Sequence, residues 1–433
     1  MDTLHDTYKD TKVGRIPKDW KLTQIGDLGE YYGGLSGKTK DNFGSGKPYI
    51  PFMNIMANDI IDVNYFDLVE IEENENQNKA IKGDIFFNTS SETPEEVGMC
   101  SVLLDDISEL YLNSFCFGFR LNKDAKERYL PEYISRFMNS GFGRKLMFPL
   151  AQGMTRYNLS KKYFVKLEIP FPPLPEQQKI AEILTTVDEQ ISTTDKIIEK
   201  SKELKIGLMQ KLLSEGIGHT EFKDTKIGRI PKNWEYVRIE EHINLFYGNA
   251  FKSSDFNEEG IGTKLLRGVN ITVGRLRWNK KIDRYLNLPY EDYAKYGAEE
   301  GDLVISMDGS LVGRNFARVN KSDLPLLIVQ RVACIRAKKS LNLEYLKQLV
   351  GSRMFLNYVD AVKTNSGIPH ISGKDIKHFK IPFPSLEEQK KIAEILSEAD
   401  VKIEREQSQK AYLEKLKKGL MQELLTGKKR VKV

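Results

Sequence analysis

The chain has 433 residues, of which 40% are hydrophobic and 29% are charged, and its formal net charge is +5 at pH 7. This length exceeds one ordinary hydrophobic core, so we expect roughly two to four domains. No run of about 18 apolar residues occurs, which excludes a membrane-spanning helix, and the mild positive charge permits nucleic-acid binding without requiring it. The three cysteines (Cys100, Cys116 and Cys334) form an odd set without metal-binding spacing, which favours the reducing cytoplasm.

In chain order, the first feature is a segment that returns later as part of a tandem repeat. Lys12–Trp20 reads Lys-Val-Gly-Arg-Ile-Pro-Lys-Asp-Trp, and Lys226–Trp234 reads Lys-Ile-Gly-Arg-Ile-Pro-Lys-Asn-Trp. The tetrapeptide Ile-Pro-Phe-Pro occurs at Ile169–Pro172 and again at Ile381–Pro384. The residues between these paired ends share little. A repeat fixes the architecture before other features do, and this one predicts one scaffold that presents two different binding segments.

The variable segment of each repeat, at about 12–170 and 224–380, is predicted to mix strands and helices. Short apolar runs after Gly-Asp turns predict buried strands at Ile85–Phe87 and Leu303–Ile305. Periodicity predicts further strands at 115–121 and 327–335 and helices at 131–147 and 346–362.

A long helix is predicted after each variable segment. We expect the first helix from Pro175 to about Leu213 and the second from just after Ser385 to about Leu425. Ser385 and Glu388 have the spacing of a capping box. Each helix would be about 57 Å long at about 1.5 Å per residue. That length overruns a typical domain, which argues against the simpler interpretation that each helix packs only on its own globular segment.

Apolar residues in both helices follow the alternating four and three spacing of a coiled coil, with polar residues at the middle of the seam. Because the first helix leads from one variable segment to the other and the second leads back, pairing would make them antiparallel about a pseudo-twofold axis, with the variable segments at opposite ends. The predicted apolar seam positions are Ile180, Leu184, Val187, Ile191, Leu208 and Leu212 in the first helix and Ile392, Leu396, Ala399, Ile403, Leu420 and Leu424 in the second.

Three sets of residues carry a family resemblance. They are the paired Gly-Arg-Ile-Pro-Lys-x-Trp and Ile-Pro-Phe-Pro elements, the paired helix starts Glu176–Leu184 and Glu388–Leu396, and the stretch Gly301–Ser310. With these elements in this order, nearly the whole chain resembles the specificity (S) subunit of type I restriction–modification systems. The first repeat departs from the pattern, because Asn88–Glu92 stands where the second has Ser-Met-Asp-Gly-Ser.

The resemblance implies an α/β (α+β) fold in which two target recognition domains in tandem repeat are separated by two long antiparallel coiled-coil helices with pseudo-twofold symmetry. The implied divisions are target recognition domain 1 at 1–173, a central conserved helix at 174–215, target recognition domain 2 at 216–384, a C-terminal conserved helix at 385–427 and a basic tail at 428–433.

The resemblance also implies a DNA-recognition subunit without catalysis of its own. Each target recognition domain would read one half of a bipartite site in double-stranded DNA, and the helices would set the gap and dock methyltransferase (M) subunits, of which two are expected. Restriction (R) subunits would join for cleavage. The complete complex would be an adenine-N6 DNA methyltransferase and an ATP-dependent endonuclease. S-adenosylmethionine, ATP and Mg are therefore expected on partner subunits, and no cofactor is expected in this chain.

The residues themselves indicate neither a catalytic site nor a metal site. Gly33–Thr39 looks like a phosphate loop but is one residue short of the required spacing. The Asn/Asp-Pro-Pro-Tyr/Phe motif of amino-methyltransferases is absent, and the five histidines lack ligand spacing. Two alternatives to a DNA reader remain open at this point: an enzyme with fused recognition segments, and a scaffold that brings partners together without binding DNA.

Candidate DNA contacts are side chains that suit base edges or phosphates, chiefly Arg, Lys and Asn. A basic run and two predicted strand ends in the second variable segment supply Lys264, Arg267, Asn270, Arg275, Arg277, Trp278, Lys280, Arg314 and Arg331. The matching place in the first segment and the polar loops that precede each long helix supply Tyr49, Asn54, Arg156, Tyr157, Asn158, Asn365 and His370. Each group has a structural alternative: a solvated strand face for the run, a hairpin anchor for Trp278, and simple turns for the loops.

Overall fold

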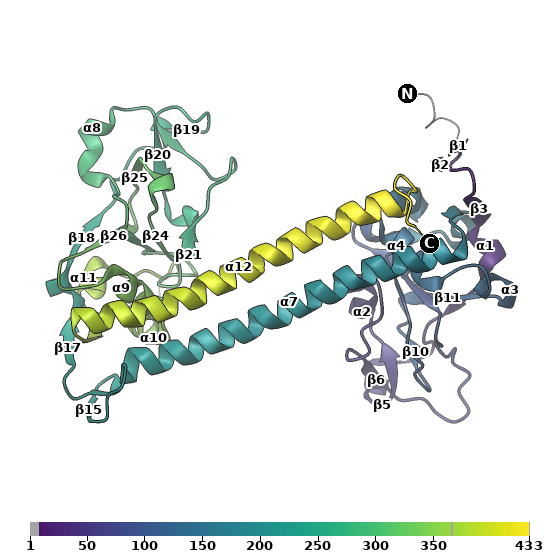
Figure 1. Cartoon of the computed structure of the whole chain (residues 1–433), viewed down its shortest axis with the longest axis horizontal. Coiled ribbons are helices and arrows are strands. Elements are labelled where there is room, and N and C mark those ends of the chain that lie inside the picture. Colours follow the sequence, from purple (N-terminus) through teal and green to yellow (C-terminus); the bar gives the residue numbers. More distant parts are fainter. Residues whose placement is uncertain (1–7, 365–366, 433) are drawn as a thin grey trace. The chain divides into compact units, whose positions relative to one another are not determined.

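The protein consists of two compact units, each of which contains a globular head and parts of two long helices. The structure is a computed structural model that describes residues 8–364 and 367–432 (Figure 1). Unit 1 comprises Met1–Asp195 and Ser408–Val433, and unit 2 comprises Lys196–Gln407. We call residues 8–173 head 1 and residues 216–384 head 2. The boundaries between the two units fall within both long helices. The domain boundaries predicted from the sequence instead separate each head from the helix that follows, and they stay a prediction.

Head 1 is built on a four-stranded sheet of order β4-β11-β7-β9, with smaller sheets β10-β5-β6, β12-β13-β8, β14-β3 and β1-β2. Its strands are β1 Tyr8–Thr11, β2 Gly14–Pro17, β3 Lys21–Gln24, β4 Gly29–Gly33, β5 Phe43–Ile50, β6 Asp67–Val69, β7 Ile85–Asn88, β8 Ser90–Ser91, β9 Cys100–Val102, β10 Tyr111–Leu112, β11 Cys116–Leu121, β12 Ala151–Gln152, β13 Tyr157–Leu159 and β14 Glu168–Phe171. Its helices are α1 Ile25–Leu28, α2 Phe52–Ala57, α3 Lys123–Lys126, α4 Pro131–Asn139, α5 Gly141–Met147 and α6 Lys161–Phe164.

Head 2 repeats this plan with a five-stranded sheet of order β18-β26-β23-β24-β21 and smaller sheets β19-β22-β20-β25, β17-β27 and β15-β16. Its strands are β15 Phe222–Thr225, β16 Gly228–Pro231, β17 Glu235–Arg238, β18 Ile243–Tyr247, β19 Phe256–Asn257, β20 Thr263–Leu266, β21 Ile271–Leu276, β22 Tyr285–Leu286, β23 Leu303–Ser306, β24 Phe316–Arg318, β25 Leu326–Ile328, β26 Val332–Ala337 and β27 Lys380–Phe383. Its helices are α8 Tyr290–Tyr293, α9 Leu343–Val350, α10 Arg353–Val362 and α11 Gly373–His378.

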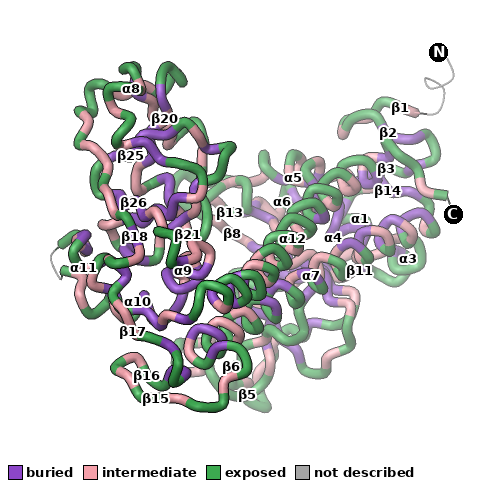
Figure 2. The backbone as a smooth tube through the Cα atoms, turned by 60° about the vertical axis from the view of Figure 1, so that its left-hand side comes forward, coloured by how far each residue is buried: buried purple, intermediate pink, exposed green. Residues whose placement is uncertain are grey.

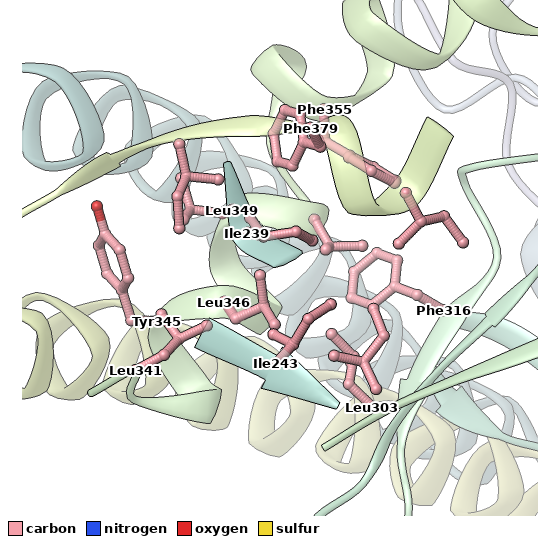
Figure 3. Packing of buried hydrophobic residues seen from close by; sticks show 14 of the residues in the cluster. Ile239, Ile243, Leu303, Phe316, Leu341, Tyr345, Leu346, Leu349, Phe355 and Phe379 are labelled. Atoms are coloured by element: carbon pink, nitrogen blue, oxygen red, sulfur yellow. The ribbon is translucent and has the colours of Figure 1, made fainter. Parts of the chain in front are cut away.

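The core of each head lies between its central sheet and the helices that cover it. Strands β7 and β23 are buried at every residue, as expected for apolar runs that are covered on both faces. In head 2, Leu303 of β23 lies in one cluster with Leu346 of α9 and Phe355 of α10 (Figure 3). The buried strands predicted at 85–87 and 303–305 are therefore confirmed.

Two predicted helices are each interrupted. The predicted helix at 131–147 is α4 followed by α5, with Ser140 between them, and the helix at 346–362 falls on α9 and α10, which are separated by Gly351 and Ser352. The Ser140 hydroxyl oxygen accepts a hydrogen bond from the Gly143 backbone N–H (3.1 Å), which makes it an N-cap that begins a new helix. A hydrophobic pattern that continues across the break hides this signal.

The predicted single strand at 327–335 was also wrong in extent. It comprises the end of β25 and most of β26, and the chain turns between them at Arg331, whose φ is +65°. Few residues other than glycine adopt this left-handed conformation. Nothing in the residue type of an arginine predicts it.

The two long helices are α7, Leu174–Glu215, and α12, Leu386–Leu424, which are 42 and 39 residues long. Both agree with the predicted helices to within two residues at each end. Gly216 and Gly427 follow the helix ends with φ of +67° and +69°, the conformation in which glycine commonly stops a helix. In the described part of the chain no helix is long and apolar enough to cross a membrane.

The predicted seam is the buried face of both helices. All twelve apolar seam positions predicted from the sequence are buried or half-buried, and Figure 2 shows this stripe along α7 and α12. In unit 1, Ile180 and Leu184 of α7 lie in one apolar cluster with Leu424 of α12. In unit 2, Leu212 of α7 shares a cluster with Leu396 of α12. Each head core thus continues into the helix pair.

Ion pairs join the two long helices at the polar middle of the seam in each unit. In unit 1, Lys417 Nζ lies 2.8 Å from Asp188 and Lys410 Nζ lies 2.7 Å from Asp195. These pairs are one heptad apart on both helices and run in opposite directions. In unit 2, Lys205 of α7 pairs with Asp400 of α12. The lysines that weaken the apolar pattern are therefore paired with aspartates of the facing helix.

A buried glutamine fixes the start of each long helix in its head. Gln177 is fully buried; its Oε1 accepts a hydrogen bond from the Leu130 N–H (2.8 Å) and its Nε2 donates to the carbonyl oxygens of Arg128 (3.0 Å) and Pro172 (2.9 Å). The equivalent residue of α12 is the equally buried Gln389. It accepts from the Asn342 N–H and donates to the carbonyl oxygens of Ser340 and Pro384.

A tryptophan–glutamate pair lies beside each of these glutamines. The indole N–H of Trp20 donates to Glu176 (3.3 Å), and that of Trp234 donates to Glu388 (3.0 Å). These residues come from the two sequence elements that are most alike in the repeats. They are alike because they build the same junction between head and helix.

Replacing Gln177 with alanine is expected to destabilise unit 1, because one N–H and two carbonyl groups, of which the Pro172 carbonyl makes a fully buried bond, lose their partner. An unsatisfied buried group costs about 1–3 kcal/mol, so we expect the free energy of unfolding to fall by at least about 2 kcal/mol in urea denaturation of the full chain. The matched control is Gln178→Ala, an exposed position on the same helix, for which a change within about 0.5 kcal/mol is expected. Equal losses for both variants would contradict this role of Gln177.

Candidate nucleic-acid interface

In head 2, several loops converge where β23 ends and β26 begins. The two strands are antiparallel neighbours and Ser306 is paired with Val332. The Met307 N–H donates to the Arg331 carbonyl oxygen (2.9 Å) just beyond this pair. The loop after β23 therefore lies against the turn before β26.

The segment that precedes α11 joins the same place. Asp308 and His370 form an antiparallel bridge, the Gly309 N–H donates to the Pro369 carbonyl oxygen (3.0 Å), and the Ile371 N–H donates to that of Met307 (3.0 Å). The loop predicted to contact DNA before the second long helix is thus held beside the Ser-Met-Asp-Gly-Ser loop.

A polar hollow of about 390 Å³ lies at this meeting point. Its wall offers guanidinium, carboxylate, amide and hydroxyl groups, which can recognise base edges. Its lining residues are Arg267, Gly268, Val269, Ser306, Asp308, Gly309, Ser310, Leu311, Asn315, Val329, Gln330 and Arg331.

Arg331 and Arg314, both predicted DNA contacts, are exposed near this hollow. Arg267 is half-buried, and its Nη2 donates to the Ile282 carbonyl oxygen (2.6 Å). Burial, followed by the nearby Arg284, lowers the pKa of Arg267 below its ordinary value. His370 is half-buried and is not among the residues that line the hollow, and Asn365 lies outside the described residues.

The basic run of head 2 separates into exposed and structural members. Arg275, Arg277 and Lys280 are exposed, on or just beyond β21, and Arg277 Nε also donates to the Val269 carbonyl oxygen (3.0 Å). Trp278 donates from its indole N–H to Asp323 (2.8 Å), and the Lys264 ammonium lies 4.6 Å from the centre of the Trp278 ring. Trp278 therefore anchors the loop after β21, and Lys264 packs on it.

Two predicted DNA contacts are corrected by their burial. Asn54 and Asn270 are fully buried. Asn54 accepts from the Asp62 N–H (2.9 Å) and donates to the Tyr65 carbonyl oxygen (2.7 Å), and Asn270 accepts from the Arg267 N–H (3.1 Å). Their amides close local turns, so no base edge can reach them in this structure.

Tyr49 is corrected for the same reason. It is a core residue of head 1 with 8% of its surface exposed, and its hydroxyl lies 3.5 Å from Asp67. Burial, followed by the charge of Asp67, raises the pKa of this phenol.

Head 1 has an equivalent convergence of segments with different side chains. The Thr89 N–H donates to the Phe115 carbonyl oxygen (2.9 Å), as Met307 does to Arg331 in head 2. Ser90 and Ser91 of β8 pair with Asn158 and Tyr157 of β13. The returning loop therefore lies beside the strand-end loop in both heads.

The exposed groups of head 1 at this place are more apolar. Phe115 is 55% exposed and Met154 is 92% exposed. The Arg156 guanidinium lies 5.7 Å from the centre of the Phe115 ring, a cation–π distance. Asn158 is exposed and Tyr157 is half-buried. Neither Phe115 of head 1 nor Asp308 of head 2 was predicted from the sequence as a candidate contact. Each lies within two residues of the end of a buried strand, and this position is the signal that could have identified them.

Comparison with known proteins bears directly on these two heads. A family model described as the type I restriction modification DNA specificity domain matches residues 17–203 and 231–415. The chain belongs to this family. Each match spans one head and much of the long helix that follows, so the protein is a specificity subunit with two tandem DNA specificity domains. Specificity subunits of type I systems are non-catalytic and bind no cofactor themselves.

Relatives are similar to this specificity subunit over nearly their full length. The type I restriction enzyme MjaVIII specificity subunit of Methanocaldococcus jannaschii is 29% identical, with 99% of this chain and 97% of the relative covered. The putative type I restriction enzyme MjaX specificity subunit of the same organism is 30% identical, with the same coverage. The crystal structure of a type I restriction–modification S subunit from M. genitalium has the same fold, with a TM-score of 0.58 at 15% identity over 94% of this chain and 96% of that chain. The predicted fold class and family are confirmed.

Replacing Arg275 and Arg277 with alanine is expected to weaken DNA binding by the complex that contains this specificity subunit. Each lost phosphate contact should reduce the slope of log K against log salt by about 0.9. Titrations of double-stranded DNA at several salt concentrations measure this slope. Arg238→Ala is the matched control, since Arg238 is exposed on β17 and pairs with Glu240 (3.5 Å). An unchanged slope in the double variant would remove both arginines from the interface.

Proposed function

We propose that each head reads one half of a bipartite site in double-stranded DNA and that the two half-sites differ. The observation that carries this proposal is the pair of equivalent strand-end convergences, which share backbone hydrogen bonds and differ in their exposed side chains. Arg331 occupies in head 2 the place that Phe115 occupies in head 1. Because base edges are recognised by side-chain donors, acceptors and apolar groups, unlike groups on the same backbone would select unlike bases.

The helix pair would act as the spacer that sets the gap between the half-sites. Within each unit, α7 and α12 are tied to each other by apolar packing and by ion pairs such as Lys417–Asp188 and Lys205–Asp400. A paired structure resists bending and sliding better than one helix. The number of residues in the pair would therefore determine the number of base pairs in the gap.

The same helices would dock the methyltransferase (M) subunits, two being expected. Large apolar side chains of both helices are exposed to solvent. Burial of such side chains against a partner subunit would stabilise the contact. The most exposed of these side chains are Val401 (64%), Tyr412 (61%), Ile206 (60%) and Leu204 (59%).

Catalysis in the complex would belong to the partner subunits. The proposed complex methylates adenine at N6 with S-adenosylmethionine on its M subunits, and restriction (R) subunits add ATP- and Mg-dependent cleavage. It would act in the cytoplasm, where its DNA substrate lies. No group in the described part of this chain is assigned a chemical step.

A methylation map would test the two-reader proposal directly. The chain would be co-expressed with its neighbouring methyltransferase, and methylated adenines would be located by long-read sequencing of host DNA. We expect a split motif with methylated adenine in both parts around a fixed, unspecified gap. A continuous motif would contradict two readers on a spacer, and no new methylation with an intact complex would favour a scaffold that does not bind DNA.

Lengthening both helices is expected to widen the gap without changing either half-site. One duplicated heptad after Ser201 of α7 and one after Ile403 of α12 would keep the ion pairs on both sides of the insertion in register. The added length is about 10 Å at 1.5 Å per residue, or about three base pairs at about 3.4 Å per base. The methylation map of this variant measures the new gap.

The control for this experiment is the heptad in α7 alone. The ion pairs Lys205–Asp400 and Lys410–Asp195 could then no longer form together, because only one helix would be longer between them. Methylation should therefore fall. An unchanged gap in the doubly extended variant, with methylation retained, would show that the helices do not set the spacing.

A further inference from the structure

Arg331 is held in an unusual backbone conformation at the hollow of head 2. Its φ is +65°, and its carbonyl oxygen accepts from the Met307 N–H (2.9 Å). The neighbouring Gln330 N–H donates to the Asn249 carbonyl oxygen (2.9 Å). A left-handed non-glycine residue costs free energy and persists where its surroundings fix it, often at functional sites. These hydrogen bonds fix the direction in which the Arg331 side chain leaves the backbone.

The guanidinium of Arg331 is exposed and held from one side only. Its side chain is 61% exposed, and Nη1 lies 3.2 Å from Oδ2 of Asp308. No other hydrogen-bond partner of this guanidinium occurs among the described residues, so its remaining donors face solvent at the rim of the hollow. Arginine presents its donors in a planar fork, which matches the two acceptors of guanine, N7 and O6, in the major groove.

The carboxylate of Asp308 distinguishes a base contact from a phosphate contact. A phosphate that approached this guanidinium would also approach the negative charge of Asp308, and the repulsion between them would offset part of the attraction. A guanine edge carries acceptor atoms but no net charge, so it avoids that repulsion. Asp308 also restricts the side-chain freedom of Arg331, which lowers the entropy lost on binding.

The equivalent position of head 1 carries different side chains. Phe115 stands at the place of Arg331. Ser90 stands at the place of Asp308, because Ser90 pairs with Asn158 of the returning loop in head 1 as Asp308 pairs with His370 in head 2. Head 1 therefore lacks the guanidinium–carboxylate pair and offers instead an exposed ring, with the Arg156 guanidinium 5.7 Å from the ring centre. An aromatic ring can contact the methyl group of thymine.

We propose that Arg331, positioned by Asp308, reads a guanine in the half-site of head 2. This assignment rests on the proposed function, because it presupposes that each head reads one half-site. It adds the base and the residue that selects it.

The test is a comparison of methylation maps for wild type, Arg331→Ala and Arg331→Lys in the complex with the methyltransferase. In Arg331→Ala we expect one guanine of one half-site to be replaced by any base, and in Arg331→Lys a weaker preference for that guanine, while the other half-site stays unchanged in both variants. At limiting enzyme, methylation of the original sites should fall by about tenfold or more, the usual range for one bidentate base contact. Lysine is expected to keep only part of the preference for guanine, because an ammonium can donate to N7 and O6 but lacks the fixed geometry of the fork.

Two controls keep the result specific. Phe115→Ala, the equivalent position in head 1, should alter only the other half-site. Arg238→Ala, which removes an exposed arginine paired with Glu240, should leave the whole motif unchanged. Thermal denaturation of each purified complex would exclude misfolding as the cause of a changed map.

Three outcomes would overturn the assignment. One is a wild-type motif without guanine in the half-site of head 2. Another is an unchanged motif in Arg331→Ala. The last is wild-type selectivity in Arg331→Lys together with a uniform loss in Arg331→Ala, which identifies a phosphate contact. In all three the split motif of the wild type remains, so the proposed function stands; a wild type without a split motif would instead overturn both.

Discussion

Each long helix is anchored at its first turn by a glutamine side chain buried in the preceding head, and the rest of each unit depends on this anchor. Gln177 and Gln389 each bind one backbone N–H and two backbone carbonyl groups. If the helix slid or rotated, these groups would lose their partners, at about 1–3 kcal/mol for each group that stays buried. Apolar packing alone tolerates small shifts, because it is not directional. The amide therefore sets the position of the helix relative to its own head, and the apolar seam supplies most of the burial.

The two units complete this attachment with different chemistry. In unit 1, the fully buried Arg136 lies 2.7 Å from Asp188, and Lys417 bridges Asp188 and Asp59. Burial alone would raise the pKa of Asp59, but the charge of Lys417 lowers it below its ordinary value. In unit 2, the neutral Gln348 donates to Asp400 (2.8 Å) at the matching place. A buried charge network is costly to break because one lost partner leaves another charge unpaired. Unit 1 is therefore more sensitive than unit 2 to a single substitution at this contact.

The features that the sequence predicted well are those that repeat or that follow a simple period. The long helices, their seam and the buried strands β7 and β23 depend on apolar spacing, which survives without knowledge of tertiary contacts. The site was harder to predict, because an asparagine that closes a turn and one that faces a base look alike in sequence. Asn54 and Asn270 were chosen for their amides, and those amides are satisfied by nearby backbone. The left-handed turn at Arg331 depends on hydrogen bonds from other segments, so no local pattern reveals it.

At this place the two heads differ in a side chain on which the backbone conformation does not depend. Arg331 and Phe115 both offer their carbonyl oxygen to the loop after the neighbouring strand. Any residue can make that hydrogen bond, because only backbone atoms take part. The side chain at this position is thus free to change while the loop keeps its shape, provided that its immediate partner changes with it. Asp308 accepts a hydrogen bond from Arg331, and the Arg156 guanidinium lies over the Phe115 ring. The junction residues have no such freedom, since Trp20, Glu176 and their counterparts bond through their side chains. A duplicated chain can therefore keep its frame and alter what each head recognises.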